Sequence, residues 1–364
     1  MLTEPTESCS PHVLFFSRGK GRGHAIPDIA IADELLRRRQ DIGVTFVSYS
    51  QGYSTLKAHN KDVIDLGLAE DAPLWDATVA IIRLLQSRRD RLIVSHEEFA
   101  VPPIAAAFGL RSVFITDWFS PADSLQMRSL KYASKIIFLD DAGYYEEPAH
   151  LSGRVYYVGT VLRPLVVTRQ ARELTRQRLG IPSAATVILV VPGGSGFHKE
   201  DRAPVFDLVA GAYDLLDVPE KRLLWVVGSP DYETLVSKRG DRRDIMILKP
   251  HFDFTPTLNA SDVLVTKGNR LPLLEAEMFG MPSLSISYGH NPIDDYRAGL
   301  IKTNTALRAR CLNPASLKLH LERAIQSATQ RRHDWVNDTL EARAAAAHHL
   351  QEALEGDLPM RVSP

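Results

Sequence analysis

The chain has 364 residues, of which 45% are hydrophobic and 24% are charged, and its formal net charge at pH 7 is −1. This length predicts roughly two domains, and the composition is typical of a globular protein with sizeable cores. The balanced charge argues against a general nucleic-acid binder, which would carry an overall basic field.

Cysteine usage and the first residues bear on the compartment. Cys9 and Cys311 are the two cysteines, and residues that far apart predict neither a disulfide framework nor a metal cluster. Residues 1–10 contain Glu4 and Glu7 and no apolar segment of a secretion signal. No run approaches the length of a membrane span. We therefore expect a reducing, cytoplasmic location, and peripheral membrane contact stays open.

The first predicted strand, residues 12–16, leads into a glycine-rich loop and then a helix over residues 28–39. The loop glycines occupy alternate positions: Gly19, Gly21 and Gly23. Glycines let a ligand approach the backbone, and Pro27 suits the first turn of a helix. An anion is favoured at such a helix N-terminus, where His24 is either a candidate general base or simply a capping residue.

Basic residues alternate with these glycines: Arg18, Lys20 and Arg22. They indicate either a solvated turn or a nucleic-acid-binding patch.

Apolar runs separated by helical stretches continue along the first half of the chain. They cover residues 43–48, 63–66, 91–94, 112–116, 135–139 and 155–158. This alternation predicts a doubly wound α/β domain, in which ligands collect at the carboxyl ends of the strands. His24, the turn over residues 95–98 and Asp117 all follow such strands.

A second series of strands begins after a predicted domain boundary near Pro164 and a charged helix over residues 169–179. Its strands cover residues 186–191, 223–227, 245–248, 263–266 and 283–287. The first of them is followed by a second glycine loop, Gly193-Gly194-Ser195-Gly196. The chain therefore builds the same kind of sheet twice.

The last predicted helix, residues 335–354, is rich in alanine and has an apolar stripe: Leu340, Ala344, Ala347 and Leu350. His348 and His349 are expected near its exposed side, without a third ligand at metal spacing.

Three motifs occur in a definite order along the chain. They are Gly21-x-Gly23-His24-x-x-Pro27, the loop at residues 193–196, and the run from Asn259 to Gly268 followed by Glu275 and Gly280. Together they resemble the GT-B glycosyltransferases, specifically the branch of MurG-like enzymes and UDP-glycosyltransferases, over roughly residues 12–300.

The resemblance implies the GT-B fold, in which two doubly wound Rossmann-like domains face each other across a cleft. The acceptor-binding domain would cover residues 11–163 and the nucleotide-sugar-binding domain residues 164–334. A helix at residues 335–356 would dock back toward the first domain.

The resemblance places the donor nucleotide in the second domain. Glu275 would accept both ribose hydroxyls, and the amides of the second glycine loop would hold the diphosphate. Lys267 or Arg270 would add a cation, and Phe252 would lie beside the nucleobase. The implied donor residues are Gly193, Gly194, Ser195, Gly196, Phe252, Lys267, Gly268, Asn269, Arg270 and Glu275.

For the chemistry, the resemblance implies that His24 removes a proton from the acceptor. A carboxylate would orient it: Glu97, with Glu98 and Asp117 as alternatives. His96 could instead touch substrate. The implied acceptor and sugar contacts are Arg18, Lys20, Gly21, Arg22, Gly23, Asp117, Asp294 and Asp295.

Two absences refine this mechanism. No Asp-x-Asp motif follows a strand, so amides and cations rather than a metal ion are expected to stabilise the leaving diphosphate. Retaining relatives carry a glutamate eight positions before the ribose-binding one, where this chain has Lys267, which favours inversion. Pro272 and the missing Asp-Gln pair depart from the family pattern and leave the donor sugar open.

The leading hypothesis is therefore an inverting, metal-independent transferase that moves a hexose-type sugar from a UDP-sugar, without a separate cofactor. The expected acceptor is a small molecule, lipid or saccharide with a negative charge. The alternatives are a nucleotide-sugar hydrolase or 2-epimerase, and a non-catalytic nucleotide-sugar binder.

Overall fold

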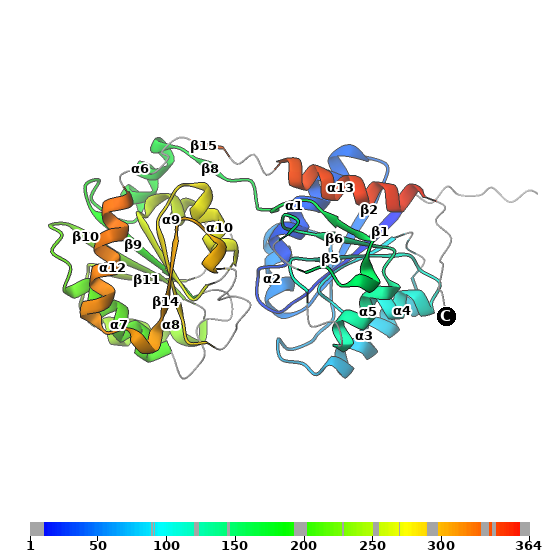
Figure 1. The fold of residues 1–364 in the computed structure, drawn as a ribbon, viewed down its shortest axis with the longest axis horizontal. Helices are drawn as coiled ribbons and strands as arrows, with labels where there is room; N and C mark the ends of the chain where they lie inside the picture. Colours follow the sequence, from blue (N-terminus) through cyan, green and yellow to red (C-terminus); the bar gives the residue numbers. More distant parts are fainter. Residues whose placement is uncertain are drawn as a thin grey trace, which may run out of the picture. The chain divides into compact units, whose positions relative to one another are not determined.

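The structure is a computed structural model that describes residues 11–88, 90, 92–119, 124–143, 146–192, 202–227, 229–249, 255–268, 270–289, 298–328, 335–336 and 340–356. It divides into two compact units (Figure 1). The first comprises Met1–Pro164 with Asp338–Pro364, and the second comprises Leu165–Asn337.

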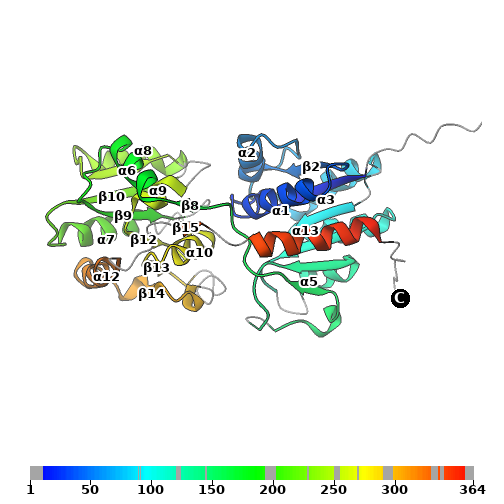
Figure 2. The same ribbon diagram turned by 90° about the horizontal axis from the view of Figure 1, so that it is seen from above.

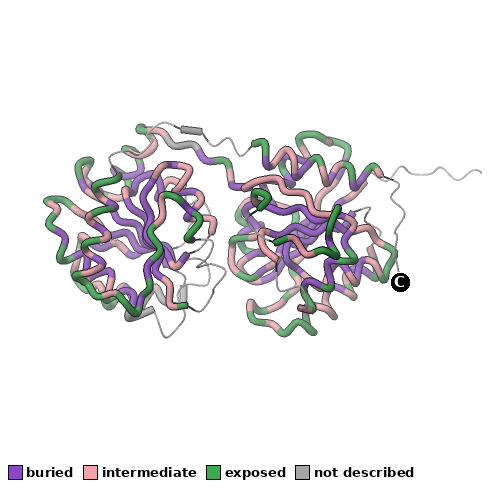
Figure 3. Tube along the Cα trace, viewed as in Figure 1, coloured by how far each residue is buried: buried purple, intermediate pink, exposed green. Residues whose placement is uncertain are grey.

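The first unit is built on a seven-stranded parallel sheet with the order β3-β2-β1-β4-β5-β6-β7. The strands are β1 (His12–Ser17), β2 (Gly43–Ser48), β3 (Val63–Asp65), β4 (Leu92–His96), β5 (Ser112–Thr116), β6 (Lys135–Phe138) and β7 (Val155–Tyr157). The central residues of β1, β2, β4, β5 and β6 are buried (Figure 3), as the continuous apolar runs predict. The strand order reverses between β1 and β4, where ligands of such sheets bind.

Helices cover both faces of this sheet. They are α1 (Ala25–Arg38), α2 (Ser50–Ala58), α3 (Leu74–Gln86), α4 (Val101–Ala107), α5 (Leu125–Ser129) and α13 (Leu340–Glu355), with single turns η1 (Leu130–Tyr132) and η2 (Ala149–Leu151). One apolar cluster joins the sheet to α1 and α13, and another joins its opposite face to α3 and α4. Figure 2 shows α13 running alongside α1, although some 300 residues separate them in sequence.

The C-terminal helix begins later than predicted, and its predicted apolar stripe is confirmed at Ala347 and Leu350 but not at Leu340. It starts at Leu340, which is exposed, and its buried positions are Ala342, Ala346, Ala347, Leu350, Ala353 and Leu354. Alanines allow the two helices to approach closely, so small residues rather than Leu340 mark the interface. His349 is also less exposed than expected, because its ring lies 4.4 Å from that of Tyr156.

The second unit repeats the strand order, with β11-β10-β9-β12-β13-β14 in a parallel sheet. Its strands are β9 (Thr186–Val191), β10 (Lys221–Val226), β11 (Ile245–Leu248), β12 (Val263–Thr266), β13 (Ser283–Ser287) and β14 (Asn304–Arg308). Its helices are α6 (Arg169–Arg178), α7 (Arg202–Asp214), α8 (Ser229–Arg239), α9 (Thr255–Ala260), α10 (Arg270–Met278) and α12 (Pro314–Ser327), with the turn η3 (Ala309–Cys311). The predicted fold of two doubly wound Rossmann-like domains is therefore confirmed.

Two parts of the second unit were missed from the sequence. Strand β14 lies at the sheet edge and is mostly exposed, so it lacks the apolar run that identifies the inner strands. Residues 335–336, predicted as helix, form β15 (Trp335–Val336), which pairs antiparallel with β8 (Val166–Val167).

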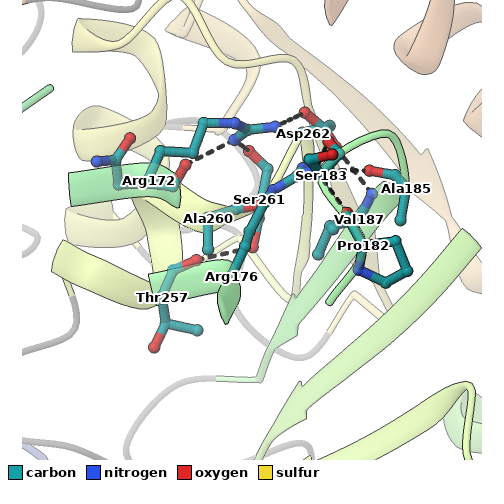
Figure 4. A network of polar contacts seen from close by, with 11 residues as sticks. Arg172, Arg176, Pro182, Ser183, Ala185, Val187, Thr257, Ala260, Ser261 and Asp262 are labelled. Carbon is teal, nitrogen blue, oxygen red and sulfur yellow. Dashed lines mark hydrogen bonds and ion pairs between the residues drawn. The ribbon is translucent and has the colours of Figure 1, made fainter. Parts of the chain in front are cut away.

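A half-buried arginine–aspartate network closes the amino end of the second sheet (Figure 4). Asp262, just before β12, pairs with Arg172 and Arg176 of α6 and accepts the backbone N–H of Val187 at 2.8 Å. Both guanidinium groups also donate to backbone carbonyls, including Ala260 O at 2.9 Å. The network thus joins α6, α9, β9 and β12.

No helix in the described part of the chain is long and apolar enough to cross a membrane.

Candidate active site

His24 lies at the carboxyl end of the first sheet, where it is the N-cap residue of α1. Its side chain makes no capping hydrogen bond. Instead, its Nε2 lies 3.0 Å from Oε2 of Glu97, with 20% of the histidine side chain exposed. The other ring nitrogen, Nδ1, is buried and has no hydrogen-bond partner among the described residues. The ring is thus anchored through Nε2, and Nδ1 is the nitrogen that remains to accept a proton.

Glu97 follows the last residue of β4 and adopts a left-handed backbone conformation, with φ of 54°. For a residue with a side chain this conformation costs on the order of 1 kcal/mol, and it occurs preferentially at functional sites. The Glu97 carboxylate is buried and accepts a second hydrogen bond from Thr116 Oγ1 at 3.0 Å. Strand ends β4 and β5 therefore hold the partner of His24 from two sides.

The Glu97 carboxylate is ionised in this setting. Burial alone would raise its pKa, but the hydrogen bond from His24 and the charges of His24, His96 and Arg18 lower the pKa far below its ordinary range. Arg18 Nη1 lies 3.6 Å from Oε2. A permanent anion can orient the His24 ring and stabilise the imidazolium that forms when His24 takes a proton.

A second histidine–carboxylate pair lies directly beneath the first. Nδ1 of His96, the last residue of β4, is 2.6 Å from Oδ1 of Asp28 in the first turn of α1, and both side chains are buried. The His24 and His96 rings meet edge to face with centroids 4.8 Å apart. Sequence reasoning missed Asp28; its position four residues after His24, on the same face of a helix, was the available signal.

The two alternative carboxylates occupy other positions. Glu98 accepts a hydrogen bond from Tyr49 at 3.3 Å, and burial raises its pKa, with Arg18 and the tyrosine partly offsetting the rise. Asp117 is half-buried after β5 and adds to the negative charge around His96. Among the three proposed partners, Glu97 is the one with a hydrogen bond to His24 recorded in the described part of the chain.

The glycine loop is more tightly packed than expected. A side chain at Gly19 would place its Cβ 2.2 Å from the carbonyl oxygen of Tyr49, so this glycine serves packing against α2 rather than ligand approach. Gly21 adopts φ of 72° with open space around it, and Gly23 is exposed.

The basic residues of this loop lie in different surroundings. Arg18 faces Glu97, Lys20 is exposed, and Arg22 is half-buried, which lowers its pKa. The prediction grouped all three with the acceptor. In the structure, the guanidinium group of Arg18 forms an ion pair with the Glu97 carboxylate.

The described part of the predicted donor site follows β12. Gly268 has φ of 100°, Lys267 and Arg270 are half-buried, and Glu275 is fully buried on α10. Pro272 is the third residue of α10, where its missing N–H would have had no partner within the helix. The remaining predicted residues lie outside the described residues: Gly193, Gly194, Ser195, Gly196, Phe252, Asn269, Asp294 and Asp295.

Among the described residues, His24, His96 and Glu97 each offer one atom that could bind a metal ion, and these three atoms lie within 4.8 Å of one another. Their atoms are already engaged in hydrogen bonds to each other, to Asp28 and to Thr116. We interpret this cluster as an acid–base network.

The chain is similar to known proteins both in sequence and in fold. No family model matches the chain. It is 24% identical over 301 residues to a UDP-N-acetylglucosamine--N-acetylmuramyl-(pentapeptide) pyrophosphoryl-undecaprenol N-acetylglucosamine transferase from Desulforudis audaxviator, which covers 76% of this chain and 78% of the relative. The crystal structure of MurG from Acinetobacter baumannii matches 94% of this chain and 99% of its own, with a TM-score of 0.60 and 14% identity. A putative UDP-N-acetylglucosamine 2-epimerase from Listeria monocytogenes matches 96% and 98%, with a TM-score of 0.64 and 13% identity.

The two matched sheets and the structural likeness define a GT-B fold. Within this fold class, the sequence relative named above is an N-acetylglucosamine transferase. The chain is similar in sequence to MurG-type transferases and in fold to GT-B glycosyltransferases, which agrees with the resemblance that its motifs predict.

Proposed function

We propose that the protein is an inverting, metal-independent glycosyltransferase that uses a UDP-sugar and employs His24 as its general base. The observation that carries this proposal is the bond between His24 and the buried, ionised Glu97 at the reversal point of the first sheet. The relatives named as UDP-N-acetylglucosamine transferases make this sugar nucleotide the first donor to test.

In the proposed step, an acceptor hydroxyl oxygen attacks the anomeric carbon of the sugar. His24 takes the hydroxyl proton, the new C–O bond forms, and the bond between the anomeric carbon and the diphosphate oxygen breaks with its electron pair leaving on the nucleotide. Glu97 stabilises the resulting imidazolium without itself becoming protonated. A single displacement of this kind inverts the anomeric configuration.

The donor would be held by the second unit. The Glu275 carboxylate suits two ribose hydroxyls, because its two oxygens accept in one plane. Lys267 and Arg270 follow β12, at the same edge of the sheet from which the loop after β9 leaves. Cations here would balance the leaving diphosphate without a metal ion.

The acceptor would carry phosphate or carboxylate, because exposed Lys20 and half-buried Arg22 flank the loop that leads to His24. Arg18 contributes less, since it already neutralises Glu97. Changing Lys20 and Arg22 to glutamate should raise the KM for an anionic acceptor; unchanged acceptor affinity would rule out this contact.

Transfer is tested by incubating the protein with UDP-N-acetylglucosamine and a panel of hydroxyl acceptors, with UDP release and product configuration as readouts. Thermal shifts with UDP, TDP and GDP identify the nucleotide, because a ligand of the native state stabilises it by mass action. Calorimetry that finds no affinity for any nucleoside diphosphate contradicts the proposal.

The likeness to a 2-epimerase structure favours one alternative, a reaction on the nucleotide sugar itself. Incubation without acceptor distinguishes the two. Rapid formation of an epimer or of free sugar would favour the epimerase or hydrolase, whereas a requirement for acceptor favours transfer. Nucleotide binding without turnover over the whole panel would indicate a non-catalytic binder.

A further inference from the structure

The first turn of α1 and the end of β4 meet through two crossed pairs of side chains. The helix contributes a histidine and then a carboxylate, His24 and Asp28, four residues apart on one face. The strand end contributes a histidine and then a carboxylate in consecutive positions, His96 and Glu97. Each histidine bonds to the carboxylate of the other element, at 3.0 Å and 2.6 Å.

We propose that the inner pair, His96 with Asp28, positions His24 against Glu97 and supplies a fixed imidazolium charge behind that catalytic dyad. This inference rests on the proposed function of His24. Asp28 and His96 are positioning residues, since both are buried beneath the dyad and neither is open to a substrate.

Because the inner pair is buried, each of its two charges depends on the other. The Asp28 side chain is fully buried and that of His96 is 4% exposed, so either charge alone would be strongly unfavourable there. Together they tie the N-terminus of α1 to β4, and the His24 carbonyl accepts the Asp28 N–H at 3.3 Å. Displacing this turn would move the His24 ring away from Glu97.

The groups that face His96 come from four elements. Asp28 and His24 belong to the start of α1, Glu97 follows β4, and Asp117 follows β5. Arg18, after β1, reaches the same cluster through Glu97. Burial disfavours a charged His96, but the three surrounding carboxylates, Asp28 foremost, outweigh it and raise its pKa above the ordinary value.

The kinetic test uses H96Q and the double variant D28N/H96Q. Replacing His96 alone leaves the Asp28 charge unbalanced, so a proton is held more tightly at the dyad and the acid limb of the kcat/KM profile should move to higher pH. The double variant removes both charges, and its acid limb should return toward wild type. Both variants should lose about tenfold to hundredfold in kcat through misplaced geometry, with little change in nucleotide KM.

His12 offers a matched control. Its Nδ1 lies 2.6 Å from Asp90, the same separation, but at the opposite end of β1. H12Q should leave the pH profile and kcat as in wild type. Thermal unfolding of every variant shows whether it is folded at the assay temperature. If H96Q unfolds, the kcat of the double variant, which keeps no unpaired buried charge, provides the test.

A measurement independent of turnover completes the test. Nitrogen NMR of histidine-labelled protein at pH 7.5 should show both ring nitrogens of His96 protonated, with the signal assigned by its loss in H96Q. A neutral His96, or variants with wild-type kcat and an unmoved acid limb, overturns the proposal. Absence of transfer in the wild type would refute the proposed function instead, while the NMR result would still decide the charge of His96.

Discussion

The two units share one strand order, and each has a cluster of paired charged side chains that joins a helix to its sheet. In the first unit, two histidine–carboxylate pairs lie at the carboxyl end, between β4 and α1. In the second, Asp262 and the two arginines Arg172 and Arg176 lie at the amino end, before β9 and β12.

Under the proposed function, this difference separates chemistry from structural support. The amino-end network satisfies nearly every donor with backbone carbonyls and consolidates four elements, so its role is structural. The carboxyl-end pairs include Glu97, whose left-handed backbone is of a kind that clusters at functional sites, and His24, whose side chain is 20% exposed. The ends of a doubly wound sheet are thus used differently within one chain.

The largest effect is expected from replacing His24. We expect H24A to lower kcat by about a hundredfold to ten-thousandfold, the contribution of a general base, while UDP affinity is retained. Steady-state transfer and calorimetry measure the two quantities. H348A, at an exposed position of α13, is the control, and near-normal transfer by H24A would remove His24 from the mechanism.

The amino-end network predicts a loss of stability without a loss of chemistry. D262A leaves Arg172 and Arg176 without their anion and should lower the free energy of unfolding by about 3 kcal/mol, as when a buried pair loses one member. Urea unfolding measures this change. D207A, which breaks the exposed pair with Lys238, should cost less than about 1 kcal/mol. Equal effects would contradict the structural role of Asp262.

Glu275 tests whether the carboxyl end of the second sheet binds the donor. E275Q keeps the side-chain shape but removes the charge, and UDP affinity should fall about tenfold to hundredfold, the value of one charged hydrogen bond. Calorimetry with UDP provides the measurement, and unfolding without ligand reports any separate loss of stability at this buried position. Wild-type affinity would assign the ribose to another residue.

The smallest effect is expected at Glu98. Burial raises its pKa, so the folded protein binds this proton more tightly than the unfolded chain does. Its contribution therefore turns unfavourable as the pH rises above the unfolded value of about 4.3. In E98Q the free energy of unfolding should decrease less as the pH rises, and the variant should be slightly more stable than wild type at pH 7. Unfolding at several pH values measures this difference. A steeper loss would show that the Glu98 charge stabilises the fold.

Much of the architecture could be predicted because buried parallel strands have a plain signature. The apolar runs that became β1, β2, β5, β9 and β12 are each covered by helices on both faces, so continuous hydrophobicity identifies them. Strand β14 and the packed face of α13 escaped this reasoning. An exposed edge strand and an alanine interface carry little hydrophobic contrast.

For the candidate site, the motif around His24 and the acidic turn at residues 95–98 are local patterns in the sequence, and the structure brings the two together. Asn259 to Asp262, which open the third motif, contribute to the arginine–aspartate network at the amino end of the second sheet. A motif records which residues occur together and does not divide them between structure and chemistry.

Local patterns in the sequence predict the two doubly wound sheets, the glycine loop that ends at His24 and the set of candidate carboxylates. The pairing of the side chains follows from the folded arrangement, in which Glu97 bonds to His24, Glu98 to Tyr49 and Asp28 to His96. Those pairings depend on how β4 lies beside the first turn of α1. They join residues about 70 positions apart, which no local pattern connects.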